Sequence, residues 1–263
     1  MSVNILRADD VWYVEREGSA VRVATDAATT AELLADRGAV ERAAREPLTD
    51  DSPRARDLAL QSPVTTPCRL VAQMVNYRSH ARESGFDPAQ VQPTFFRKAS
   101  HSISGPTDRI RRPDHVRLLD YEIELGLVFG APLPVGTTVT AESLPHYVAG
   151  LVIANDVSAR DVQLIKGQFY ESKSYPTFTP VGPRLVLLDA AEMRRLVDLR
   201  LQLWVNGSLR QDRTVADMIV EPPAALTALV PAARRGIRAP APQGPRPGNS
   251  GPAPRRISNC GWR

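Results

Sequence analysis

The stretch with the clearest chemical potential is LLDYEIELGLVFG, residues 118–130, where Asp120, Glu122 and Glu124 alternate with apolar residues. This alternation predicts a β-strand with the acids on one face and the apolar side chains on the other. Carboxylates at neighbouring positions of one face emerge about 6.7 Å apart, a spacing from which two can converge on one cation. The segment therefore predicts a divalent-metal site, and an exposed edge strand with solvated acids is the alternative.

A second stretch, HYVAGLVIANDVSARDVQ (residues 146–163), adds polar residues at the end of an apolar run. The run 147–154 predicts a buried strand that ends in Asn155 and Asp156, and strand ends of this kind often build sites. Asp156 could supply a third oxygen ligand. Three carboxylates with positions left for water or substrate suit Mg²⁺ or Mn²⁺, allow Ca²⁺, and disfavour a closed structural zinc site.

A third stretch, VNYRSHARESG (residues 75–85), contains His80 and Glu83 three residues apart. On a helix the two side chains would share a face, so the carboxylate could orient the imidazole or act with it to deprotonate water. A lone histidine near a loop is more often structural or merely exposed, and the pattern alone does not separate these interpretations.

The spacing of apolar runs and turn residues predicts how the chain is organised. Residues 3–25 read as a short β meander and residues 29–45 as helix, which together predict a small N-terminal β-rich module over residues 1–46. Residues 47–67, rich in Pro, Ser, Thr and charge, are expected to be a linker. Short apolar runs bounded by Gly and Pro then predict an α+β domain built on a mixed sheet over residues 68–230.

Composition excludes several classes of protein. With 263 residues and 43% hydrophobic side chains the chain can bury a sizeable core. The net charge of +4 comes from residues 231–263, which hold seven Arg and no acid, so the rest of the chain is mildly acidic and nucleic-acid binding is not the default. No signal peptide or membrane-spanning run is evident, which predicts a soluble cytoplasmic protein. Two isolated cysteines exclude a disulfide framework or a thiolate metal site.

Together, these stretches resemble the fumarylacetoacetate hydrolase family. Its pattern is a His-x-x-Glu segment after a strand, then PTFFRKASHS, the Asp-x-Glu-x-Glu strand, NDVSARDVQ, KSYPTFTPVGP and the VNG turn with its following MI, in the order in which they stand here. The resemblance covers about residues 68–229. It implies a mixed β-sheet roll of the fumarylacetoacetase C-terminal-domain type and a homodimer.

The resemblance also implies roles for individual residues. It places a divalent metal on Glu122, Glu124 and Asp156, in agreement with the spacing argument. Further residues are placed around the substrate, with Lys173 offering positive charge to an enolate or carboxylate. These substrate-side residues are Arg160, Gln163, Lys173 and Thr177. Lys98 lies in a matching motif, and a salt bridge within the sheet is an equal alternative for it.

The implied reaction is hydrolysis of a carbon–carbon bond in a 1,3-dicarbonyl or 2-oxo acid substrate. The metal would act as a Lewis acid while His80 and Glu83 activate water, and Lys173 would stabilise the enolate. Decarboxylation, isomerisation and hydration begin from the same chelated oxo acid, so the shared motifs leave them open. Retention of both His80 and Glu83 places hydrolysis first.

The C-terminal segment departs from the family pattern. After PAALTALV the family continues with a PGD turn and a TGTP segment, and neither is present in residues 231–263. Seven Pro and seven Arg in this segment predict a disordered tail. Such a composition would also result from an out-of-frame reading of GC-rich DNA, which is one hypothesis for it. The other is a catalytically impaired relative whose basic tail binds nucleic acid or another acidic surface.

Overall fold

The computed structural model describes residues 2–167, 169–234 and 260–261, which form the α+β fold that the sequence predicts. The strands are β1 (Val3–Ala8), β2 (Val11–Arg16), β3 (Ser19–Arg22), β4 (Leu60–Gln61), β5 (Leu70–Met74), β6 (Thr94–Lys98), β7 (Ile103–Ser104), β8 (Leu119–Asp120), β9 (Ile123–Phe129), β10 (Val148–Asn155), β11 (Ser158–Ala159), β12 (Thr179–Leu187), β13 (Arg200–Val205), β14 (Ser208–Thr214) and β15 (Cys260–Gly261). The α-helices are α1 (Thr30–Ala35), α2 (Arg37–Arg45), α3 (Arg78–Glu83), α4 (Leu144–Tyr147), α5 (Arg160–Lys166), α6 (Phe169–Lys173), α7 (Ala190–Met193) and α8 (Pro222–Arg234). Single 3₁₀ turns are η1 (Ala55–Asp57), η2 (Pro88–Gln90), η3 (Ser100–Ser102), η4 (Leu196–Asp198) and η5 (Val215–Asp217).

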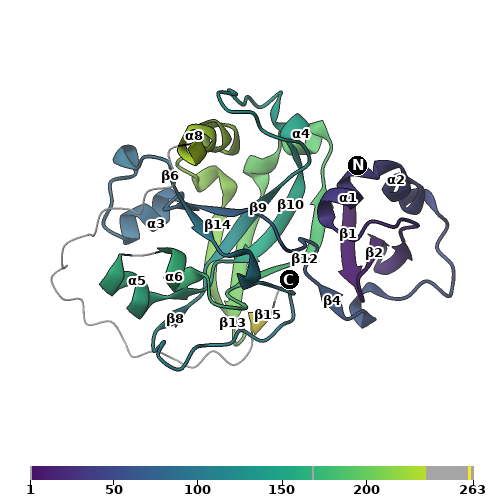
Figure 1. Cartoon of the computed structure of the whole chain (residues 1–263), viewed down its shortest axis with the longest axis horizontal. Helices are drawn as coiled ribbons and strands as arrows, with labels where there is room; N and C mark the ends of the chain where they lie inside the picture. The colour runs from purple at the N-terminus through teal and green to yellow at the C-terminus, as the bar shows by residue number, and fades with distance from the viewer. Residues whose placement is uncertain (1, 168, 235–259, 262–263) are drawn as a thin grey trace.

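The main sheet has the order β3-β2-β1-β12-β10-β9, with β4 added to β1 and β7 to β12. Of the pairings described in this sheet, β7–β12 is parallel and the others are antiparallel, so the sheet is mixed and mainly antiparallel. Figure 1 shows β9, β10 and β12 in the middle of the molecule and α5 and α6 on the far side from the N-terminal strands. Residues 148–152 of β10 are buried and Ile153 and Ala154 are partly buried, and this strand leads directly to Asp156.

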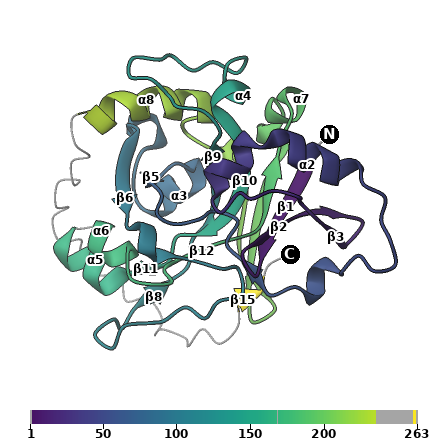
Figure 2. The same ribbon diagram turned by 45° about the vertical axis from the view of Figure 1, so that its right-hand side comes forward.

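The N-terminal segment extends the same sheet. Strand β1 pairs with β12, and β12 pairs with β10, the strand that leads to Asp156, so the meander β1-β2-β3 belongs to the same sheet (Figure 2). Helices α1 and α2 cover it, and their apolar side chains share one core with Trp12 of β2 and Leu185 of β12. The division into a module (1–46), a linker (47–67) and a main domain (68–230) stays a prediction.

A second core lies behind the candidate site. It contains Tyr77, Ile123, Leu203 and Met218 and joins β9 to the β13-β14 hairpin. Burial of such side chains contributes about 1.5–3 kcal/mol each. This core therefore fixes β9 and the start of α3 relative to each other.

The carboxylate strand is shorter than predicted. Instead of one strand over 118–130, the chain forms β8, which pairs with β11, and β9, which pairs with β10, with a break at residues 121–122. At the break the backbone N–H of Glu122 donates to the Asn155 side chain at 3.0 Å, and the Asp156 N–H donates to the Glu122 carbonyl at 2.8 Å. These bonds replace the sheet ladder and bring residues 122 and 156 together.

Most of the predicted C-terminal tail, residues 235–259 and 262–263, lies outside the described residues. Helix α8 continues to Arg234, and Cys260–Gly261 pairs with β13 as β15. The prediction of a disordered tail over residues 231–263 is therefore wrong for the end of α8, residues 231–234, and for β15. A search of the described ranges finds no helix with the length and apolar character needed to span a bilayer.

Candidate active site

A buried lysine connects two of the predicted metal ligands. Lys173 lies at the end of α6 with its side chain 4% exposed. Its ammonium group donates to an oxygen of Glu122 and, at 2.6 Å, to Oδ2 of Asp156. The two carboxylates therefore converge on one cationic point.

Arg160 holds the other oxygen of Glu122. As the first residue of α5, it donates from Nη2 to Glu122 Oε1 at 2.6 Å and from Nε to Asp120 Oδ2 at 2.8 Å. Its Nη1 donates to Gln163 Oε1 at 2.7 Å. Arg160 and Gln163, both predicted near the substrate, are thus in contact with each other, and Arg160 orients the carboxylate cluster.

Lys98, the last residue of β6, contacts the second carboxylate oxygen of Asp156. Its Nζ donates to Asp156 Oδ1 at 2.5 Å and to the Phe178 carbonyl at 3.0 Å. The side chain is 2% exposed, so the contact is a buried ion pair rather than a surface one. Lys98 therefore joins the site directly through Asp156.

This cluster contains one more acidic side chain than basic side chains. Lys98, Lys173 and Arg160 pair with Asp120, Glu122 and Asp156, and no ion pair within the described part of the chain includes Glu124. Burial, with the nearby charges of Glu122 and Asp156, raises the pKa of Glu124 to about 8. Against the effect of burial, the Lys173 and Arg160 charges lower the pKa of Glu122 to about 2.

The donor set fits a hard divalent cation by its chemistry. Among the described residues no group of three or more His, Cys, Asp and Glu side chains is already arranged as a metal cage. However, Glu122 and Asp156 both accept from Lys173 Nζ. Their negative charges add to the effect of burial in raising the pKa of Glu124. The Asn155 amide nitrogen is buried and has no hydrogen-bond partner among the residues that the structure describes. Carboxylate oxygens are the ligands that Mg²⁺ and Mn²⁺ take, and cation entry would require Lys173 to release one of them.

Besides Glu124, three of the predicted residues are not hydrogen-bonded to this cluster among the described residues: His80, Glu83 and Thr177. His80 is half-buried on α3. Glu83 on the same helix accepts from Arg213 Nη2 at 2.7 Å, and no bond within the described ranges joins it to His80. Thr177 has a positive φ of 70° and its hydroxyl accepts from the Arg111 N–H at 2.7 Å.

Helix α3 is attached to the segment around η5 by a set of long-range bonds, which we call the α3 clamp: Asn76 to Ile219 and Val220, Arg78 to Ala216 and Met218, and Ser79 to Asp217. Asp217 Oδ2 accepts both from the Ser79 N–H at 3.1 Å and from its hydroxyl at 2.5 Å. Burial, with the charges of Glu124 and Asp217, raises the pKa of Tyr77 at the start of the helix. The α3 clamp therefore sets where His80 stands relative to the carboxylates.

Removing the Asp217 carboxylate is expected to loosen α3 without unfolding the protein. In Asp217→Ala the helix loses a cap-like contact worth about 1 kcal/mol, so its amides should exchange with solvent about fivefold faster. Hydrogen exchange of residues 79–83 measures this directly. Asp198→Ala is the matched control, because Asp198 forms an exposed ion pair with Arg195. Equal exchange of α3 in both variants would contradict the role of the α3 clamp.

Several contributors to the site were not singled out by the sequence. Ser158 donates to Glu122 Oε2 at 3.1 Å, and the Phe178 carbonyl accepts from Lys98. Ser158 belongs to the NDVSARDVQ motif, so its place in the motif was an available signal. A backbone carbonyl and the clamp residue Asp217 carry no comparable signal, because their contacts depend on how distant segments pack.

Comparison with known proteins identifies the family to which this chain is similar. Residues 69–233 match the family model described as fumarylacetoacetate (FAA) hydrolase C-terminal. The chain is 34% identical over 165 residues to an oxaloacetate tautomerase, fahd2, of Xenopus laevis, covering 62% of this chain and 50% of that one. It is 34% identical over 170 residues to oxaloacetate tautomerase YisK of Bacillus subtilis, covering 64% and 55%. The chain thus spans about half the length of the curated relatives it matches.

Solved structures of similar fold include enzymes of more than one reaction. A probable 2-hydroxyhepta-2,4-diene-1,7-dioate isomerase from Mycobacterium abscessus is 28% identical with a TM-score of 0.70, covering 88% of this chain and 80% of that one. Maleylpyruvate hydrolase from Sphingobium sp. SYK-6, in complex with manganese(II) and pyruvate, is 25% identical with a TM-score of 0.66, covering 86% and 82%. Because the family model matches more than half of its residues, this chain belongs to the fumarylacetoacetate hydrolase family.

Proposed function

We propose that this chain is a divalent-metal-dependent enzyme that forms the enolate of a small 2-oxo acid, with enol–keto tautomerisation as its first candidate reaction. The observation that carries the proposal is the Lys173 ammonium group, buried between Glu122 and Asp156. Mg²⁺ or Mn²⁺ would be held by Glu122, Glu124 and Asp156, with Ca²⁺ a further possibility. When bound, the cation supplies a Lewis acid for the oxygens of the substrate.

The site residues would each help to form or stabilise the enolate. Lys173 places a fixed positive charge where negative charge develops, and a buried charge of this kind acts more strongly than one in water. Lys98 and Arg160 hold Asp156 and Glu122 in place through their ion pairs. Gln163 orients Arg160, and Thr177 would shape the loop that follows Lys173.

Tautomerisation comes before hydrolysis because it needs only a proton to move. Hydrolysis of a carbon–carbon bond requires a base that activates water, and the predicted His80–Glu83 pair would be that base. The Glu83 carboxylate is bonded to Arg213 instead, so it is not positioned against His80. The curated relatives compared above are themselves named oxaloacetate tautomerases, which supports the same order.

Hydrolysis remains the second candidate, favoured by the likeness to maleylpyruvate hydrolase. His80 lies on α3, the helix that the α3 clamp holds. A small shift of α3 would change which groups the His80 imidazole faces. Decarboxylation and hydration would begin from the same chelated 2-oxo acid and are further outcomes of one assay. A homodimer and a cytoplasmic location stay predictions.

A substrate panel tests the proposal. The full chain with Mn²⁺ is given oxaloacetate, and the enol-to-keto change is followed by ultraviolet absorbance, with acylpyruvates tested in parallel for cleavage. Faster tautomerisation with intact acylpyruvate supports the first candidate. Cleavage that is lost in His80→Ala would favour the second, and no conversion of either class by the metal-loaded chain would contradict both.

A further inference from the structure

A pocket of about 460 Å³ lies away from the carboxylate cluster, among the N-terminal strands, the η1 segment and β12. Its lining residues are Leu6, Glu15, Gly18, Arg54, Ala55, Arg56, Leu60 and Arg184. The volume is that of a small-molecule site, and none of these residues takes part in the proposed chemistry. We propose that this pocket, called the arginine pocket below, binds a small organic dianion such as a dicarboxylic acid.

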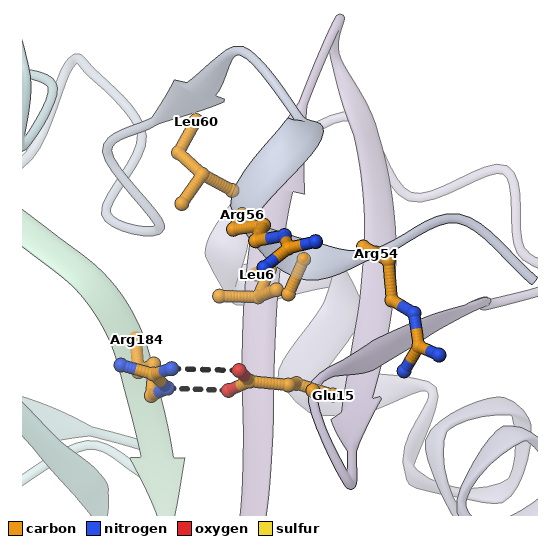
Figure 3. Close-up of a pocket in the computed structure, with 8 residues that line it drawn as sticks. Leu6, Glu15, Arg54, Arg56, Leu60 and Arg184 are labelled. Atoms are coloured by element: carbon orange, nitrogen blue, oxygen red, sulfur yellow. Dashed lines mark hydrogen bonds and ion pairs between the residues drawn. The ribbon is translucent and has the colours of Figure 1, made fainter.

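The charge of the arginine pocket is the first support. Three arginines and one glutamate line it, which gives a formal charge of +2. Both oxygens of Glu15 are taken by Arg184, one of them by Nη2 at 2.6 Å (Figure 3). Figure 3 shows Arg56, from η1, above this pair, and Arg54, the residue before η1, beyond Glu15 on the side away from Arg184. Two guanidinium groups are therefore left without a lining carboxylate among the described residues.

The existing contacts of Arg54 and Arg56 are weak enough to leave donors for a ligand. Arg54 Nη1 donates to the Ser19 hydroxyl at 3.3 Å, and Arg56 Nε stands 3.7 Å from Asp57 with both side chains mostly exposed. Each guanidinium has five N–H donors in a planar fork, which matches a carboxylate with two parallel bonds. Two carboxylates on one ligand would match the charge of +2.

The walls of the arginine pocket favour an organic ligand over a bare inorganic ion. Leu6, Ala55 and Leu60 give it an apolar side that can contact a short carbon chain. The wall is held in place by backbone bonds, Ala55 N–H to the Gly18 carbonyl at 2.9 Å and Ala20 N–H to the Pro53 carbonyl at 2.8 Å. Strand β4 also pairs with β1 at Ala8 and Leu60. The cavity is therefore formed before a ligand arrives.

The test is a calorimetric titration of the full-length, metal-free chain with succinate, phosphate and neutral succinamide. Succinate should bind saturably and succinamide should not. Arg56→Ala should weaken succinate binding about tenfold, as expected for a charge-assisted bond. Arg45→Ala, which removes an exposed side chain of α2, should not change it. Glu15→Gln raises the formal charge of the pocket and should tighten binding, a gain that a misfolded variant cannot produce.

Two results would overturn the proposal. One is the absence of succinate binding, or equal succinate affinity in the wild type, Arg56→Ala and Glu15→Gln. Equal affinities would place the bound anion at another site, such as Lys173. The other is phosphate binding more tightly than succinate, which would remove the role of the apolar wall. Because the titration needs neither metal nor turnover, its failure is independent of the proposed enolate chemistry.

Discussion

Glu122→Gln is expected to lower the turnover of a 2-oxo acid by at least about a hundredfold, since even outer partners of a metal ligand cost 10–100-fold. Glutamine has no negative charge, so the three-carboxylate set loses its best-connected member, the one that both Lys173 and Arg160 contact. The fold should survive, because Lys173 keeps Asp156 and Arg160 keeps Asp120. Steady-state kinetics of oxaloacetate conversion, with circular dichroism as the check on folding, measures the effect.

Glu171→Gln is the matched control for this experiment. Glu171 is also a glutamate paired with a lysine, Lys166, but that pair is exposed on the surface between α5 and α6. Its replacement should leave turnover within about twofold of the wild type, as for most exposed ion pairs. If Glu122→Gln stayed as active as Glu171→Gln, Glu122 would not be a metal ligand.

Lys173→Met should affect both stability and catalysis. The ammonium group separates two buried carboxylates, and removal of one partner of a buried ion pair costs about 3–5 kcal/mol. We expect about 3 kcal/mol, the lower end of that range, because Glu122 keeps Arg160 and Asp156 keeps Lys98. Urea denaturation of the metal-free variant measures the free energy of unfolding, and turnover should fall as the charge that stabilises the enolate is lost.

Adding Mn²⁺ gives this variant a second readout. If Glu122 and Asp156 hold the cation, Mn²⁺ should restore part of the lost stability, because it supplies the positive charge that Lys173 no longer does. Lys166→Met, at the exposed pair, should change neither stability nor its response to Mn²⁺. A Lys173→Met protein as stable as Lys166→Met without metal would contradict the buried bridge.

The sequence predicted the parts of this structure that depend on local pattern. Period-two alternation located the acids of residues 118–130, and the apolar run of β10 predicted that Asp156 would follow a buried strand. The N-terminal meander and the helices after it also follow from local periodicity. The α+β fold was therefore accessible from the sequence.

The side chains and backbone groups that contact these acids could not be predicted from local pattern. The alternating pattern continues through Tyr121 and Glu122, so nothing in it marks the break between β8 and β9; bonds from residues 155 and 156 create that break. Lys98 and Asp156 are 58 residues apart, and Ser79 and Asp217 are 138 apart. Such contacts depend on tertiary packing, which also decides that Glu83 meets Arg213 rather than His80.

The most direct test of a metal site at these carboxylates is a calorimetric titration of Mn²⁺ into the purified, metal-free chain, with Asp156→Asn as control. We predict saturable binding at one site per chain in the wild type and none in Asp156→Asn, because this carboxylate joins Lys98 and Lys173 at the centre of the cluster. Equal Mn²⁺ binding by both proteins would place the metal elsewhere. A folded wild-type chain that binds no Mn²⁺ would contradict metal-dependent enolate chemistry at Glu122, Glu124 and Asp156.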